Sequence, residues 1–580
     1  MLEQGQFWRN KDLRKHVAII DGKVAPTIVL KNGTYLNVFT DEWVTANIWI
    51  YHERIVYVGD EMPKLLDDTE IVNCTGQYLV PGYIEPHAHP YQLFNPESLV
   101  QHVGEFGTTT LINDNLRLLT LYDKKKAFSI IENFQKIPVS MLWWARFDSQ
   151  SMLRNEEAIF NTNDILSWLS HPAIVQGGEL TSWPRLIDGD DRLLYWIQEA
   201  KRIHKRVEGH FPGASEKTLT KLQLLGVNGD HESMNGEDVL KRLQLGYHAA
   251  LRHSSIRPDL ENILQQLLEK GLKNFDALFF TTDGSTPSYT EYGMMNICID
   301  IALKQGIPII DAYKMASFNI AKYYRMDETF GSITPGRLAH INILYEETDP
   351  TPLSVLAKGT WLVKDGKEVE QATQIPWEQY ETDKPFLKME LTEEDLQFSI
   401  PVGLKLINNV ITNPYAVGID ITGAQLPTNT ADAFLVLLDR HGKWRVNSVI
   451  HGFTEKLGGL CSSYSTTNDI LLIGKKKIDM KLAFDRMQEI GGGIVLAHDG
   501  EIIFELPLTI EGVMSVEKME KVIQADKTLT KLLQEAGFPY DDPVFTLFFL
   551  SSTHLPYIRI TPEGIIDVIK RDIIVPANMR

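Results

Sequence analysis

Cysteine is scarce in this 580-residue chain, and long apolar runs are absent. The three cysteines, Cys74, Cys298 and Cys461, lie far apart and form no CxxC pair, so neither a disulfide framework nor a thiolate zinc cluster is indicated. We expect all three to be buried as small apolar residues. No apolar stretch approaches the length of a membrane span, and residues 1–11 are polar and mixed in charge. The sequence therefore predicts a cytoplasmic protein with no membrane partner.

Positive charge is in deficit as well. The chain carries 57 Lys and Arg residues against 76 Asp and Glu residues, a formal net charge of -19 at pH 7. Such a charge disfavours binding to duplex nucleic acid and to an anionic membrane surface, but it does not affect a small neutral substrate. Hydrophobic residues make up 43% of the chain, an ordinary globular value that predicts a sizeable core.

Strand and helix patterns divide the chain into consecutive segments. Short alternating runs separated by turn signals, such as Asn32-Gly33, predict sheet, whereas short apolar runs that alternate with helical patterns predict a βα barrel. The segments are a charged and uneven extension that is helical or irregular (residues 1–26), a small sheet (27–80), a barrel (81–334), a second set of strands (335–394) and a mixed section of strands and helices that follows a polar stretch (395–580).

The motif His87-Ala88-His89 stands directly behind an apolar run from Tyr78 to Glu85. Side chains alternate along a strand, so the two imidazoles point to the same side and can offer two nitrogens to one metal ion. Taken alone, the motif fits equally well with two ordinary strand-end histidines.

Further candidates also follow strand-like runs. They are Glu179, His210, His231 with Glu232, and Asp283. Parallel strands of a barrel bring their C-terminal ends to one face, so we expect these side chains to meet His87 and His89. Imidazole nitrogens and carboxylate oxygens are ligands of hard or borderline divalent metals. Together the residues predict a metal site at the mouth of the barrel.

With these motifs the chain resembles the bacterial adenine deaminases of the amidohydrolase superfamily. The resemblance runs from about residue 28 to the C-terminus. The stretches that carry the resemblance are residues 209–213, 229–233, 282–283 and 315–324. The resemblance implies an α/β fold, namely a (β/α)8 TIM-like barrel of the metal-dependent hydrolases. It also implies that the two predicted strand sets form one small composite β domain, and that the last section is an α+β domain.

The resemblance further implies a purine base as substrate and the conversion of adenine into hypoxanthine and ammonia. His87 and His89 would bind a first metal ion and His210 and His231 a second, with Glu179 bridging the two. The family points to Mn²⁺ or Fe²⁺, while the nitrogen and oxygen ligands also permit Zn²⁺. We expect two ions per chain, and the sequence leaves homo-oligomerisation open.

The same residues account for the chemistry. A carboxylate that bridges two ions, here Glu179, lets hydroxide form near neutral pH. Asp283 is predicted to touch one metal and to move the proton from water to the leaving group as general base. Glu232 is the candidate for protonating a ring nitrogen; alternatively, it only orients His231. The deaminases with a Pro-Cys-x-x-Cys motif are excluded, because this chain has no paired cysteines.

Three aromatic residues near the motifs are candidate substrate contacts. Trp183, Phe211 and Tyr289 could stack on a purine, although packing around the barrel mouth is the commoner role for such residues.

The chain departs from the family pattern at four places. They are Pro90-Tyr91-Gln92, Asn115-Leu116-Arg117, Gly284 and Ser465-Thr466-Thr467-Asn468. None of them removes a predicted metal ligand, but several fall where contacts to the substrate are expected. Adenine is therefore the leading substrate, and two alternatives stay open. One is a hydrolase of the same superfamily that acts on another cyclic amide or amidine, and the other is a metal-loaded ligand-binding protein with little turnover.

Overall fold

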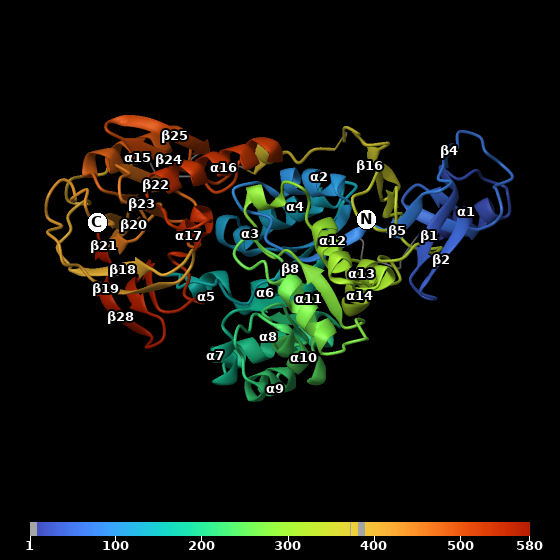
Figure 1. Cartoon of the computed structure of the whole chain (residues 1–580), viewed down its shortest axis with the longest axis horizontal. Helices are drawn as coiled ribbons and strands as arrows, with labels where there is room; N and C mark the ends of the chain where they lie inside the picture. The colour runs from blue at the N-terminus through green and yellow to red at the C-terminus, as the bar shows by residue number, and fades with distance from the viewer. Residues whose placement is uncertain (1–8, 372, 381–388) are drawn as a thin grey trace.

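The protein consists of a central barrel with a β-rich domain at either end. The structure is a computed structural model that describes residues 9–371, 373–380 and 389–580. The small β domain and the C-terminal domain lie on opposite sides of the barrel (Figure 1). Part of the polar stretch predicted before residue 395 lies outside the described residues, as do residues 1–8 of the N-terminal extension. No helix in the described ranges is long and apolar enough to cross a membrane.

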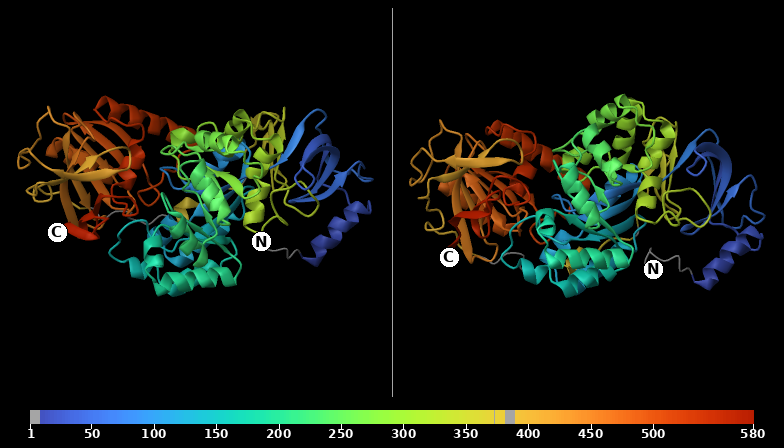
Figure 2. Two further views of the ribbon diagram at one scale, coloured as in Figure 1. Left: turned by 60° about the horizontal axis from the view of Figure 1, so that its bottom comes forward. Right: turned by 90° about the horizontal axis from the view of Figure 1, so that it is seen from below.

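The small β domain is a single sheet built from both sides of the barrel. Its strand order is β17-β16-β15-β14-β5-β1-β2-β3, with β4 paired to β1. Its strands are β1 (Ile28–Asn37), β2 (Glu42–Tyr51), β3 (Arg54–Gly59), β4 (Glu70–Asn73), β5 (Tyr78–Pro81), β14 (Ile341–Leu344), β15 (Ser354–Ala357), β16 (Thr360–Lys364) and β17 (Lys367–Glu368). The antiparallel pairing of β14 with β5 joins the two predicted strand sets. Helix α1 (Asn10–Ile20) lies at the outer edge of this domain (Figure 2).

Two local predictions in this region are corrected by the structure. Asn32-Gly33 is no turn between strands; it forms an irregularity within β1, where Asn32 has a φ of 57° and donates its N–H to the side chain of Asn47. The apolar run from Tyr78 to Glu85 is not one strand either. It divides at Gly82 into β5 of the small domain and β6 of the barrel. A Cβ at Gly82 would lie 2.1 Å from Thr109 Oγ1, so the close approach of the two domains requires glycine.

The central sheet confirms the predicted barrel. Its parallel strands run in sequence order from β6 to β13. They are β6 (Tyr83–Ala88), β7 (Thr108–Asp114), β8 (Ser140–Ala145), β9 (Ile174–Leu180), β10 (Arg206–Gly209), β11 (Gly229–Asp230), β12 (His248–Arg252) and β13 (Leu278–Thr281). The buried carboxylate of Glu85 on β6 links the two outer strands, because it accepts hydrogen bonds from Thr281 Oγ1 at 2.7 Å and Thr282 N at 2.8 Å.

Helices cover the outside of the barrel. The longer ones are α2 (Pro96–Glu105), α4 (Lys124–Phe134), α6 (Thr162–Ser170), α8 (Asp191–Arg202), α9 (Glu216–Leu224), α10 (Gly236–Gln244), α11 (Leu260–Glu269) and α12 (Met295–Gln305). Their ends follow from the sequence. Helix α2, for example, begins after Asn95, whose side chain accepts hydrogen bonds from the N–H groups of Glu97 and Ser98, with Pro96 in the first position. Helix α10 buries Val239 against the barrel.

The C-terminal domain is α+β, as predicted. A mainly antiparallel sheet has the order β19-β18-β21-β20-β23-β22-β24-β25, with β29 paired to β21, and a small sheet has the order β26-β27-β28. The strands are β18 (Val402–Leu406), β19 (Thr412–Ala416), β20 (Asp432–Leu438), β21 (Trp444–His451), β22 (Gly459–Ser462), β23 (Ile470–Gly474), β24 (Gly493–His498), β25 (Glu501–Pro507), β26 (Ile558–Thr561), β27 (Gly564–Asp567), β28 (Asp572–Pro576) and β29 (Asn578–Met579). Its helices are α15 (Lys477–Glu489), α16 (Met519–Glu535) and α17 (Pro543–Phe549). Helices α16 and α17 both lie on the side of the domain that faces the barrel (Figure 1).

Candidate active site

The C-terminal ends of the barrel strands bring ionisable side chains to one face. Each strand from β6 to β13 contributes at least one, either from its last residues or from the loop that follows. The side chains are His87, His89, Asp114, Arg146, Glu179, Glu208, His210, Asp230, His231, Arg252 and Asp283. All six predicted metal-ligand residues are among them, and the structure brings these six together.

Glu179 lies between two pairs of histidines. Its Oε2 atom is 3.7 Å from His87 Nε2 and 3.9 Å from His89 Nε2. Its Oε1 atom is 2.8 Å from His210 Nδ1 and 3.5 Å from His231 Nε2. Each oxygen of one carboxylate therefore faces one pair, which is the arrangement that a bridging ligand between two metal ions needs.

Asp283 lies beside both pairs. Its Oδ1 atom is 3.1 Å from His89 Nε2, and its Oδ2 atom is 3.7 Å from His231 Nε2. The residue has a left-handed backbone with a φ of 51°, which aspartate tolerates better than most side chains. Burial alone would raise the pKa of Asp283, but Arg252 and His89 hold that pKa well below its usual range. Asp283 is therefore a carboxylate at neutral pH.

These side chains fit a divalent metal centre. The combinations His87, His89, Glu179 and Glu179, His210, His231 each place their ligand atoms within 4.8 Å of one another, and Asp283 forms a third such group with His87 and His231. Both ring nitrogens of His87 and the Nδ1 atom of His231 are buried and have no hydrogen-bond partner in the described part of the chain. A buried polar atom without a partner costs free energy, and a bound cation would satisfy Nε2 of His87.

Two further carboxylates stand behind the histidines. Asp114 Oδ2 is 2.9 Å from His89 Nδ1, so it fixes the ring with its Nε2 atom toward Glu179. Glu208 lies 3.9 Å from His87 Nδ1 and 3.8 Å from His231 Nδ1, too far for a hydrogen bond but close enough for charge attraction. Burial would raise the pKa of Glu208, yet the two histidines lower it to about 2.

Sequence reasoning missed three arginines in the site. Arg146 Nη2 lies 2.7 Å from both Glu179 Oε2 and Asp114 Oδ2. Arg252 Nη1 contacts Glu232 and lies 2.8 Å from Asp283 Oδ2, while Arg257 contacts the other oxygen of Glu232. A usable signal existed for two of them, because Arg146 follows the apolar run of β8 directly and Arg252 ends β12, just as the predicted ligands end their strands.

The arginines determine the charge of Glu232. Its Oε1 atom is 3.5 Å from both His210 Nδ1 and His231 Nε2. Burial would raise the pKa of Glu232, but His210, Arg252 and Arg257 together lower it to about 2. Glu232 is therefore an ionised carboxylate at neutral pH.

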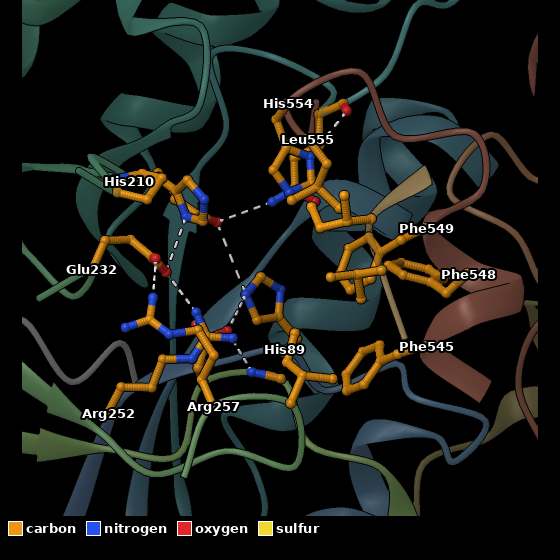
Figure 3. Close-up of a pocket in the computed structure, with 18 of the residues that line it drawn as sticks. His89, His210, Glu232, Arg252, Arg257, Phe545, Phe548, Phe549, His554 and Leu555 are labelled. Carbon is orange, nitrogen blue, oxygen red and sulfur yellow. Dashed lines mark hydrogen bonds and ion pairs between the residues drawn. The ribbon is translucent and has the colours of Figure 1, made fainter. Parts of the chain in front are cut away.

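The site opens into a cavity of about 360 Å³ between the barrel and the C-terminal domain. This volume lies in the usual range of small-molecule sites. On one side the cavity has the charged barrel residues, and on the other it has apolar and aromatic residues (Figure 3). The apolar lining consists of Pro212, Met234 and Ile256 from the barrel and of Val410, Ile411, Phe545, Phe548, Phe549 and Leu555 from the C-terminal domain.

His554 is a further polar residue of this lining that the sequence analysis did not single out. Its ring centroid lies 5.3 Å from that of His210, and its Nδ1 atom is 3.3 Å from the carbonyl oxygen of Gln150. Burial, aided by His210, lowers the pKa of His554 to about 3, so its imidazole is neutral. No sequence signal marked it, because it follows the apolar helix α17 and belongs to no motif.

The three aromatic candidates from the sequence do not line the cavity. Trp183 and Phe211 pack edge to face with ring centroids 6.2 Å apart, and Phe211 is fully buried. Tyr289 shares a hydrogen bond of 2.9 Å with His253 Nε2. The aromatic side chains that do line the cavity come from helix α17 instead.

The comparisons with known proteins cover both large domains. The amidohydrolase family model matches residues 78–362, and the model of the adenine deaminase C-terminal domain matches residues 409–572. A protein of Oceanobacillus iheyensis, provisionally named adenine deaminase, is 55% identical over 579 residues, with 100% of both chains covered. A Bacillus subtilis protein with the same provisional name is 50% identical, again with 100% of both chains covered.

More distant proteins are similar as well. The adenine deaminase of Bacillus velezensis is 27% identical, with 94% of this chain and 96% of its own chain covered. Among solved structures, the β-aspartyl dipeptidase of Fervidobacterium islandicum aligns with 60% of this chain and 99% of its own, at 17% identity and a TM-score of 0.47.

Proposed function

The chain belongs to the adenine deaminase family of the amidohydrolases, and from this premise we propose that it hydrolyses adenine to hypoxanthine and ammonia. One observation carries the proposal: the Glu179 carboxylate lies between two histidine pairs, with Asp283 beside both pairs at the cavity. The substrate is a small neutral purine base, which the cavity volume of about 360 Å³ accommodates.

The proposed metal ligands are six. They are His87, His89, Glu179, His210, His231 and Asp283. Two divalent ions per chain would give each histidine pair one ion and make Glu179 the bridge. Manganese or ferrous iron is the preferred occupant, and zinc is compatible with the same donors. When bound, such ions supply a nucleophile near neutral pH, because they lower the pKa of water.

Asp283 is the proposed general base. Its carboxylate borders the cavity and is ionised, so an Oδ atom can take a proton from the attacking water. The same oxygen then delivers the proton to the amino nitrogen that leaves as ammonia. Arg252 contacts Asp283 and holds its carboxylate in place during these transfers.

Glu232 is the second proposed catalytic residue, as the donor of a proton to a ring nitrogen. Its pKa of about 2 means that Glu232 is ionised at neutral pH, so the proton that it passes to the ring nitrogen must come from the attacking water, whose other proton leaves with ammonia through Asp283. The competing role is orientation of His231, whose Nε2 atom is 3.5 Å from Glu232 Oε1. The two roles make different predictions for an uncharged replacement.

We expect Glu232→Gln to lower kcat for adenine by about 10²-fold while two metal ions stay bound, because an amide cannot move a proton. The measurement is steady-state kinetics together with the metal content per chain. Asp259→Asn is a matched control, since Asp259 pairs with Arg257 but does not line the cavity, and it should leave kcat within a factor of about two. Loss of one metal ion from Glu232→Gln would favour the orienting role instead.

The proposed function itself is tested by mixing manganese-loaded protein with adenine and following ammonia release and the ultraviolet change. The substitutions at residues 90–92, 115–117 and 465–468 favour one alternative, a hydrolase of another cyclic amide or amidine, so a panel of such compounds is included. Turnover of adenine supports the proposal. No turnover of adenine with two ions bound would contradict it, and no turnover of any compound would favour a metal-loaded binding protein.

A further inference from the structure

The four sequence segments that depart from the family pattern are linked by a chain of contacts, which reaches the cavity at Gln92 and Gly284. Arg117, at the start of helix α3 (Leu116–Leu121), reaches into the C-terminal domain. Its Nη1 atom donates a hydrogen bond to Asn468 Oδ1, and its Nη2 atom donates to the carbonyl oxygen of Ser465 at 2.8 Å. The guanidinium lies 5.9 Å from the ring centroid of Tyr464. Arg117 therefore holds the segment around Tyr464 against the barrel mouth.

Tyr464 in turn contacts the segment behind the histidine motif. Its hydroxyl group, on a fully buried side chain, donates a hydrogen bond to Gln92 Oε1. Gln92 is itself only 4% exposed. With the carbonyl oxygen of this amide accepting from Tyr464, its NH₂ group points the other way.

Gly284 makes room for that NH₂ group. A Cβ at residue 284 would lie 3.1 Å from Gln92 Nε2 and 3.4 Å from His89 Cδ2, so any side chain there would crowd the amide. Gln92 and Gly284 both line the cavity, as do His89 and Asp283. The amide donor therefore lies beside Gly284, which follows Asp283 directly in the chain, and near the ring of His89.

We propose that Gln92 is a substrate-binding residue that donates a hydrogen bond from Nε2 to an acceptor atom of the substrate ring. Tyr464 of the C-terminal domain and Arg117 of the barrel are positioning residues that orient the amide. This inference rests on the proposed function and narrows its substrate class to a ring with an unprotonated nitrogen or a carbonyl oxygen that faces Gln92. A neutral buried donor selects such a ring, because a C–H group in that place would leave the N–H unpaired.

The test compares adenine with 3-deazaadenine and 7-deazaadenine, in which a C–H group replaces one ring acceptor. For the manganese-loaded wild type, kcat/KM should fall about 10- to 100-fold on one of the two analogues. Gln92→Ala should lose about the same factor on adenine and should no longer discriminate against that analogue. The inference is overturned if the wild type discriminates against neither analogue, or if Gln92→Ala slows all three compounds equally.

Tyr464→Phe tests the positioning role, because it removes only the hydroxyl group. It should raise KM for adenine about 3- to 10-fold with little change in kcat, and it should have no further effect in a Gln92→Ala background. Tyr540→Phe is the matched control, since Tyr540 also lies in the C-terminal domain but its hydroxyl group donates to the carbonyl oxygen of Leu406 and not to Gln92. An equal effect of Tyr464→Phe in both backgrounds, together with a lower Tm, would mean a structural role and would overturn the positioning assignment.

If the proposed reaction is wrong, the result differs from the one expected if only the role of Gln92 is wrong. Wild-type protein that holds two metal ions but releases no ammonia from adenine contradicts the reaction, whatever Gln92 does. The inference is then decided by titrating wild type and Gln92→Ala with adenine and with hypoxanthine. A dissociation constant about 10-fold higher for the variant supports a ring contact, and equal values for the two proteins overturn it.

Discussion

Glu179→Gln is expected to remove both metal ions from the purified protein and to lower kcat/KM for adenine by about 10³-fold or more. The two carboxylate oxygens of Glu179 face the two histidine pairs separately, at 2.8 to 3.9 Å from the ring nitrogens, so one substitution weakens both halves of the site. Glutamine preserves the volume of the side chain, which limits the effect to charge and ligation. Metal content per chain after dialysis and steady-state kinetics check the prediction.

Glu105→Gln serves as the matched control for this experiment. Glu105 is a partly buried carboxylate whose pKa is raised to about 7 by burial and by its acidic neighbours, and it lies in helix α2, away from the cavity. We expect it to leave the metal content and kcat/KM unchanged. If Glu179→Gln instead keeps two ions after dialysis, Glu179 is not the bridging ligand.

Asp283→Asn is expected to lower kcat by about 10² to 10⁴-fold while metal stays bound at saturating concentrations. The amide has nearly the same shape as the carboxylate, and its oxygen still faces His89, but it cannot take a proton from water. Single-turnover measurements with adenine, alongside the metal content, separate the loss of proton transfer from a loss of ligation.

Asp114→Asn provides the contrast. Asp114 contacts His89 Nδ1 and Arg146 but does not line the cavity, so it acts through His89 and through the arginine that contacts Glu179. We expect Asp114→Asn to weaken metal affinity about 10- to 100-fold. Excess metal should then restore much of the kcat of this variant. Turnover by Asp283→Asn that matches wild type would rule out the general-base assignment.

Much of the fold and of the candidate metal site could be predicted from the sequence. The family resemblance, the barrel and the α+β domain are confirmed, and the predicted metal-ligand residues lie together. Each of these ligands ends a strand or follows one, and the ends of parallel barrel strands meet whatever the loops do. Arg146 and Arg252 obey the same rule, because Arg146 follows β8 directly and Arg252 ends β12, so their positions carry the same signal as those of the ligands.

The substrate side of the site was not predictable in the same way. Trp183, Phe211 and Tyr289 were chosen because they stand near the motifs in sequence, but the cavity is lined by Phe545, Phe548 and other residues of the C-terminal domain. Those residues lie in an apolar stretch whose sequence is typical of a buried hydrophobic core. No periodicity distinguishes an apolar side chain that packs inside its own domain from one that faces the cavity of another.

The sequence by itself determined the barrel and the cluster of histidines and carboxylates at its mouth, because strand alternation and strand ends are local properties of the chain. The tertiary structure alone decided what surrounds the substrate. Gln92 and Tyr464 are 372 residues apart, and their hydrogen bond exists only because the C-terminal domain docks on the barrel mouth. Docking depends on the complementary shape and charge of two folded surfaces, and no pattern within either segment encodes that contact.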